Sequence, residues 1–95
     1  MSNFEKVGEF HSKFGAPIHE KPCLGDPERQ ALRLELIKEE FFELTEAIRQ
    51  QNIVETADAL GDLLYVVYGT GHEFGIQLDE VFAEIHDSNM SKLGE

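Results

Sequence analysis

Two apolar stripes with helical spacing, separated by a single break at Asn52, constrain the fold of this chain more than any other feature. Before the break, apolar residues recur at intervals of three and four: Leu34, Ile37, Phe41, Leu44 and Ile48. After it the same spacing continues with Ile53, Ala57, Leu60, Leu64 and Val67. This spacing is typical of amphipathic helices. Because long helices joined by a short turn pack antiparallel, the pattern predicts a helical hairpin.

Start and stop signals place the helix ends. Asp26 is a good N-cap and Pro27 suits the first helical position, so a helix is predicted from there to about Gln51. The helix after the break is predicted over about 54–72. A first helix over about 3–14 precedes Gly15, with Phe10 and Phe14 expected in the core, and a last helix is predicted over about 78–88. Its expected inner stripe consists of Leu78, Val81, Phe82 and Ile85.

These elements predict an all-α fold, an antiparallel helical bundle of about four helices forming a single domain over residues 1–95. A chain of 95 residues without an internal disulfide has a small core, so we expect oligomerisation to complete the bundle. Two features agree with that expectation. Residues 63–68 are apolar on every side, and Phe42 projects from an otherwise polar helix face.

The charge of the chain excludes several classes of partner. Eight Lys and Arg residues against nineteen Asp and Glu residues give a net charge of −11. Nucleic-acid backbones and anionic membrane surfaces attract the opposite charge, so we expect no nucleic-acid partner and no membrane partner. The sequence has neither an apolar run long enough to span a bilayer nor a secretory signal at its start. With Cys23 as its only cysteine, we expect a cytoplasmic protein.

Carboxylates on the hairpin are the candidate functional residues. A helical wheel places Glu40 and Glu43 beside a second, smaller apolar stripe, with Glu39 at its edge. Asp58 and Asp62 stack on one side of the next helix. Antiparallel packing puts the two groups at comparable heights, where hard oxygen ligands favour Mg²⁺ or Mn²⁺. Magnesium commonly shares its coordination with substrate phosphates, which indicates a phosphate-ester or nucleotide substrate.

A simpler interpretation of the same residues is a solvated acidic face with Lys or Arg partners, and spacing alone does not separate the two. We prefer the simpler interpretation for Glu35, Glu46 and Glu84. The apolar neighbours of Glu40, Glu43 and Asp62 favour the metal site there. The four histidines have no metal-ligand spacing, so we expect them at the surface or hydrogen-bonded and partly buried.

Two segments, 39–44 (EEFFEL) and 58–65 (DALGDLLY), resemble the all-α nucleoside triphosphate pyrophosphatases, which include MazG-like proteins and phosphoribosyl-ATP pyrophosphohydrolases. The signature of that superfamily is ExxE on one helix and ExxD on the next. Glu40 and Glu43 fit the first motif, whereas Ala59 occupies the first acidic position of the second. Val66 stands where phosphoribosyl-ATP members tend to have His, which disfavours that substrate. The resemblance extends from about residue 10 to residue 92.

The resemblance implies Mg²⁺-dependent hydrolysis of a nucleoside triphosphate to the monophosphate and pyrophosphate, as in housekeeping of the nucleotide pool, with Mn²⁺ as a possible substitute. It implies that the metal is held by Glu39, Glu40, Glu43 and Asp62, with Asp58 or Glu55 compensating for Ala59. Glu39, Glu40 and Glu43 are then the catalytic residues, and Glu39 is the candidate base that accepts a proton from water.

The resemblance also assigns substrate-binding roles to Asn89 and Lys92, although a polar tail after the last helix explains the same residues. It implies a homodimer or homotetramer, and a C-terminal tail beyond Glu95 that closes the site. The alternative function is a non-catalytic acidic helical oligomer that binds a protein partner or senses nucleotide without hydrolysing it.

Overall fold

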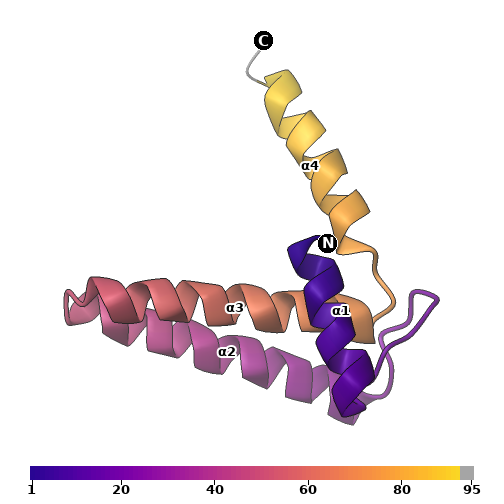
Figure 1. Ribbon diagram of the computed structural model, residues 1–95, viewed down its shortest axis with the longest axis horizontal. Coiled ribbons are helices and arrows are strands. Elements are labelled where there is room, and N and C mark those ends of the chain that lie inside the picture. The colour runs from indigo at the N-terminus through magenta and orange to yellow at the C-terminus, as the bar shows by residue number, and fades with distance from the viewer. Residues whose placement is uncertain (93–95) are drawn as a thin grey trace.

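The computed structural model describes residues 1–92 and consists of four helices in the described range, with no strand there (Figure 1). These are α1 (Asn3–Phe14), α2 (Pro27–Arg49), α3 (Ile53–Glu73) and α4 (Leu78–Lys92). The helices α2 and α3 lie side by side and antiparallel, and α1 crosses α3 near the carboxyl end of α3 (Figure 1). The predicted all-α class and the helical hairpin are confirmed.

Local capping explains where the hairpin helices begin. The Asp26 side chain accepts a hydrogen bond of 2.9 Å from the Arg29 amide, and Pro27 opens α2. The Asn52 side chain accepts a bond of 3.1 Å from the Glu55 amide, so the predicted break is also the N-cap of α3. Gly15 ends α1 in the left-handed conformation with φ of 71°. These boundaries agree with the sequence signals to within about two residues.

The hairpin packs closely through small residues. Ala47 of α2 and Ala59 of α3 are each only 5% exposed. Further along α3, Gly69 lets two polar side chains approach the backbone. A Cβ atom at that position would lie 2.7 Å from Arg33 Nη2 and 2.8 Å from His11 Nε2, which is closer than real contacts allow. The two hairpin helices are therefore in close contact at these small residues, and the larger apolar side chains lie outside the contact.

Most of the apolar side chains predicted to form the core are exposed in the single chain. In α2, Leu34 is 63%, Phe41 61% and Ile48 53% exposed, and in α3 Leu64 is 52% exposed. Phe10 and Phe14 are also exposed, so their predicted place in the core is wrong. Residues 63–68 are not buried all round within this chain either. The physical reason is that no described helix covers the apolar side of the hairpin.

The helix α4 belongs to the all-α fold but does not pack along the α2–α3 hairpin. It rises away from α2 and α3 (Figure 1), and only its first turn is tied to the rest, through Ser2 Oγ donating to Asp79 Oδ2 over 2.6 Å. Val81, Phe82 and Ile85, predicted as an inner stripe, are 40%, 70% and 51% exposed. The helix also extends to Lys92, so residues 89–92 are helical rather than a tail. The predicted C-terminal tail lies outside the described residues.

Within residues 1–92, no helix is both long enough and apolar enough to cross a bilayer.

Candidate functional site

Three carboxylates from the two hairpin helices converge on one point. Glu40 and Glu43 lie one turn apart on α2, and Asp62 reaches them from α3. Each offers one oxygen atom, and the three oxygens lie within 4.8 Å of one another. The structure thus brings together three of the five residues that the sequence suggested as metal ligands. We call Glu40, Glu43 and Asp62 the carboxylate cluster.

Glu40 has the most unfavourable surroundings in this cluster. Its side chain is partly buried, and its Oε2 atom is inaccessible to solvent and has no hydrogen-bond partner within residues 1–92. Burial raises the pKa of Glu40 above its usual value of 4.5, and the negative charges of Glu43 and Asp62 raise it further. An unpaired buried carboxylate oxygen is costly. A hard divalent cation bound to the three oxygens would remove this cost, so the donor set fits Mg²⁺ or Mn²⁺.

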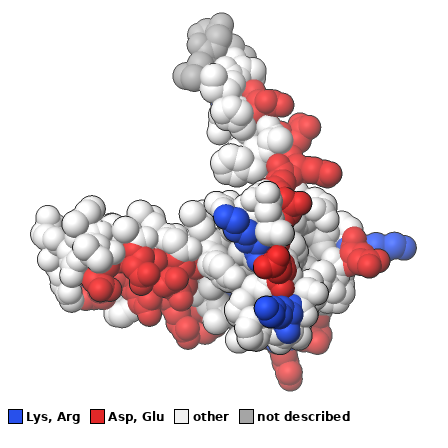
Figure 2. Space-filling model, in the orientation of Figure 1, with Lys and Arg blue, Asp and Glu red and all other residues white. Residues whose placement is uncertain are grey.

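Further acidic residues border the cluster without joining it. Asp58 and Glu55 line a shallow groove of about 440 Å³ together with Glu43 and Ala59. Ala59 is buried in the hairpin, and the acids nearest to it along α3 are Asp58, one residue before it, and Asp62, three residues after it. Glu39 is exposed and lines a separate hollow on α2. In Figure 2 the carboxylates of the hairpin form one continuous acidic surface.

The predicted substrate residues Asn89 and Lys92 are not near the carboxylate cluster of their own chain. Both are exposed on the last turns of α4. That end of α4 is the part of the helix farthest from the α2–α3 hairpin (Figure 1). The structure therefore separates these two residues from the other candidates.

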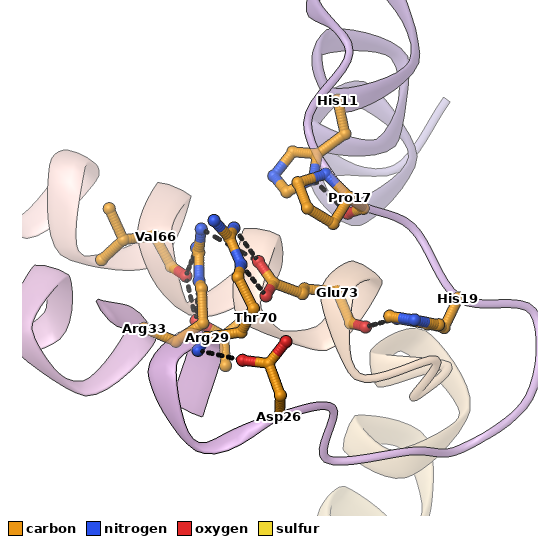
Figure 3. Close-up of polar contacts among 9 residues, drawn as sticks. All are labelled: His11, Pro17, His19, Asp26, Arg29, Arg33, Val66, Thr70 and Glu73. Atoms are coloured by element: carbon orange, nitrogen blue, oxygen red, sulfur yellow. Dashed lines mark hydrogen bonds and ion pairs between the residues drawn. The ribbon is translucent and has the colours of Figure 1, made fainter. Parts of the chain in front are cut away.

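A second polar centre at the other end of the hairpin was not anticipated from the sequence. Glu73, only 1% exposed, accepts two hydrogen bonds of 2.7 Å from Arg29, and Arg33 Nη1 lies 3.8 Å from it (Figure 3). Arg33 also donates to Thr70 Oγ1 over 3.0 Å and to the Val66 carbonyl over 2.9 Å. We call Arg29, Arg33 and Glu73 the arginine–glutamate junction. One sequence feature could have indicated this centre: Arg33, a charged residue, lies two turns before Glu40 on the same face of α2.

The junction has the opposite electrostatic character to the carboxylate cluster. The hydrogen bonds from Arg29 lower the pKa of Glu73 below 4.5 despite its burial, and the positive charges of both arginines act in the same direction. Every charged group there has a partner, as buried polar groups normally do. The junction connects α2 to α3 and offers no open ligand position, so its role is structural.

Three histidines connect α1 and the loop after it to neighbouring elements. His11 Nδ1 pairs with the Pro17 carbonyl at 3.0 Å, and His72 Nε2 with the Phe4 carbonyl at 2.7 Å. His19 Nδ1 contacts the Glu73 carbonyl (Figure 3). Burial lowers the pKa of His11, so a neutral imidazole is favoured there. The prediction of hydrogen-bonded rather than metal-binding histidines agrees with these contacts.

Comparison with known proteins identifies the family of the chain. A cluster of oxygen ligands between two antiparallel helices is the kind of site that metal-dependent hydrolases use. The family model described as phosphoribosyl-ATP pyrophosphohydrolase matches residues 7–89, which include the carboxylate cluster and most of α4. The chain belongs to this family.

The chain is also similar to a viral protein. The chain is 48% identical over 82 residues to the uncharacterized protein L479 of Acanthamoeba polyphaga mimivirus. The match covers 82% of this chain and 33% of the viral protein, so the chain spans about a third of the length of that relative.

Proposed function

We propose that this chain is a Mg²⁺-dependent nucleoside triphosphate pyrophosphohydrolase that releases a nucleoside monophosphate and pyrophosphate. The observation that carries the proposal is the convergence of Glu40, Glu43 and Asp62, whose oxygens lie within 4.8 Å of one another. Membership of a pyrophosphohydrolase family supports the class of reaction. Like charges are held this close in folded proteins mainly where a cation or a proton neutralises them.

In this proposal Glu40, Glu43 and Asp62 hold the cation, and Asp58 supplies a further oxygen from the adjoining groove in place of the acid missing at Ala59. The bound cation would orient the phosphates, neutralise their charge and lower the pKa of the attacking water. Water adds to a phosphorus atom of the α–β anhydride, and the bridging P–O bond breaks. Glu39, exposed at the rim, accepts the proton that the water loses.

The family description and the residue at position 66 both bear on the substrate. The matched family acts on phosphoribosyl-ATP according to its description, whereas Val66 replaces the histidine that such members tend to have. Val66 is partly buried, and its apolar side chain offers no hydrogen-bonding group to a substrate; its backbone carbonyl accepts a hydrogen bond from Arg33. We therefore propose an ordinary nucleoside triphosphate as the substrate, used in cytoplasmic housekeeping of nucleotides.

We also propose a homodimer or homotetramer as the active form. Large apolar side chains are exposed on α2, α3 and α4, and large exposed apolar patches commonly mark protein interaction sites. The alternative function, a non-catalytic oligomer that binds a protein or senses nucleotide, uses the same surface. It differs in that the carboxylate cluster would not be required for any turnover.

The test is pyrophosphate release from a panel of ribo- and deoxyribonucleoside triphosphates, with phosphoribosyl-ATP included, in Mg²⁺ and in Mn²⁺. Glu43→Gln is the cluster variant, and Glu35→Gln, an exposed acid on the outer face of α2, is the matched control. Metal-dependent release that is lost in Glu43→Gln and kept in Glu35→Gln supports the proposal. Absence of release from every substrate favours the non-catalytic alternative.

A further inference from the structure

We propose that His11 is a pH-sensitive switch, which keeps α1 docked on the α2–α3 hairpin while its imidazole is neutral and releases α1 when the imidazole is protonated. The inference goes beyond the proposed function, because it concerns how α1 is held and does not depend on catalysis. It starts from the position of His11 on α1, where the side chain is only 4% exposed (Figure 3). Histidine normally changes its charge between about pH 5 and pH 8, and burial of the charged form is costly.

The hydrogen bond of His11 defines the ring atom that a proton would join. Nδ1 lies 3.0 Å from the Pro17 carbonyl oxygen, which can only accept, so Nδ1 carries the hydrogen and donates. In the neutral ring Nε2 is then unprotonated. Nε2 lies over Gly69, where an added Cβ atom would be 2.8 Å from Nε2 and 2.7 Å from Arg33 Nη2. The proton would therefore enter a small space that a guanidinium group already borders.

The charges around His11 come from both hairpin helices, and the acid among them is already paired. From α2, the buried Arg33 guanidinium faces the ring. From α3, the centre of the His72 ring lies 5.9 Å from that of His11, and Glu73 provides a negative charge. The Glu73 carboxylate accepts two hydrogen bonds of 2.7 Å from Arg29, and Arg33 Nη1 lies 3.8 Å from it. The loop after α1 contributes only a carbonyl group. A proton on His11 would thus add positive charge to a group that already contains two arginines and one glutamate.

These surroundings make the docking of α1 depend on pH. Burial lowers the pKa of His11 below its usual 6.5, and the charges of Arg33 and His72 lower it further, although the bond to Pro17 and the charge of Glu73 act against them. When α1 is released the ring is hydrated, and its pKa returns to about 6.5. The released form then binds a proton that the docked form excludes. Docking is therefore strongest above about pH 6.5, weakens as the pH falls through that value, and weakens no further below the pKa of the docked ring.

Protonation of His11 would affect α1 and the first turn of α4 and leave the hairpin intact. Further contacts of α1 lie in its first half, where Phe4 and Val7 are buried and the Phe4 carbonyl pairs with His72 Nε2 at 2.7 Å. At the start of α1, Ser2 donates to Asp79 of α4 over 2.6 Å. Release of α1 would therefore also remove this link to α4. The hairpin does not depend on α1, because α2 and α3 lie against each other along most of their length (Figure 1).

The test is amide hydrogen exchange of the full chain, measured by mass spectrometry for α1 and for the hairpin separately. It is performed between pH 7.5 and pH 5.5 at fixed ionic strength and protein concentration, and corrected for the intrinsic pH dependence of exchange. We expect the opening of α1 to increase at least about threefold over this range, whereas α2 and α3 keep their protection. His11→Asn keeps a donor near the position of Nδ1 and cannot take up a proton, so its opening should not change with pH. His86→Asn, which replaces an exposed histidine of α4, is the matched control and should behave like the wild type.

A second measurement on the wild type covers the case in which His11→Asn does not fold. NMR titration of the ring nitrogens should show the hydrogen of neutral His11 on Nδ1, and should show protonation of this ring at a lower pH than in the chain unfolded by urea. Protonation of His11 at the same pH in both states would overturn the proposal. Three results of the exchange experiment would also overturn it: opening of α1 that does not change with pH in the wild type, the same pH dependence in His11→Asn, or opening of α1 and the hairpin together.

Discussion

The hairpin of α2 and α3 holds two groups of charged residues, each with one buried or partly buried carboxylate, and the groups differ in whether that carboxylate has a cationic partner. At the arginine–glutamate junction, Glu73 accepts two hydrogen bonds from Arg29 and its pKa is lowered. At the carboxylate cluster, Glu40 faces Glu43 and Asp62 and its pKa is raised. The same pair of helices therefore carries one group that favours folding and one that opposes it.

The difference shows how to separate structural from functional charge in a chain this acidic. A buried charge with all its partners present holds elements together and leaves no position for a ligand. A buried charge without a counter-charge destabilises the fold unless something else binds there. The junction connects α2 to α3 at the end of the hairpin where α1 crosses (Figure 1). The four predictions below test this division, in order of decreasing effect.

The largest effect is expected from breaking the junction. Glu73→Gln leaves the buried Arg33 without its counter-charge, and removing one partner of a buried pair costs about 3 kcal/mol or more. Urea unfolding followed by circular dichroism, at one fixed protein concentration, measures the change in the free energy of unfolding. The double variant Arg33→Met/Glu73→Met should regain most of the loss, because it leaves no charge unpaired at Arg33. A loss below about 1 kcal/mol in Glu73→Gln would show that the junction does not hold the hairpin.

The second prediction concerns activity. Glu43→Gln should reduce pyrophosphate release by at least about 100-fold, since even residues that only support metal ligands contribute 10- to 100-fold. Its unfolding free energy should stay within about 0.5 kcal/mol of the wild type, as for other exposed positions. Steady-state assays of Glu43→Gln beside Glu35→Gln measure the contrast. If both variants lose activity equally, the cluster has no special role among the acids of α2.

The third prediction separates the two groups through metal binding. At a Mg²⁺ concentration of ten times its dissociation constant, the wild type should gain about 1.4 kcal/mol of stability. Asp62→Asn, which removes an oxygen ligand on α3, should lose this gain. Glu73→Gln should have a lower free energy of unfolding than the wild type. It should nevertheless gain a similar amount of stability from Mg²⁺, because the junction binds no metal. Thermal unfolding with Mg²⁺ and with EDTA measures these shifts, and an undiminished gain in Asp62→Asn would place the metal elsewhere.

Sequence signals were sufficient for the local structure and for the cluster. Asp26, Pro27 and Asn52 marked helix ends through capping, which depends only on neighbouring residues. Helical spacing also brought Glu40 and Glu43 to face Asp62, because two antiparallel helices leave little freedom of register. Asp58 lines a groove beside the cluster and does not join it, because its position depends on the exact rotation of α3 about its axis.

Sequence signals did not predict the features that depend on contacts between residues distant along the chain. Apolar stripes such as Leu34, Phe41 and Ile48 indicate a face that becomes buried, but they do not say which chain buries it. The pairing of Arg29 with Glu73 joins residues 44 positions apart, and neither residue stands out without the fold. For the same reason the direction of α4, and with it the separation of Lys92 from the cluster, was not predicted.

The smallest effect, and the one that tests the comparison most directly, is the pH dependence of two matched variants without metal. At pH 7, Glu40→Gln should raise the free energy of unfolding by about 0.5 kcal/mol, because it removes repulsion from Glu43 and Asp62. The pKa of Glu40 is raised in the fold, so this penalty exists above its folded pKa and vanishes as the pH falls through that value toward 4.5. The pKa of Glu73 is lowered, so its contribution is complete above 4.5 and is lost only as the pH falls further. Urea titrations between pH 7 and pH 3 should therefore show the Glu40→Gln gain fading first, and the Glu73→Gln loss shrinking only at lower pH. If both differences faded over the same range, the two carboxylates would share one environment and the contrast drawn between them would be wrong.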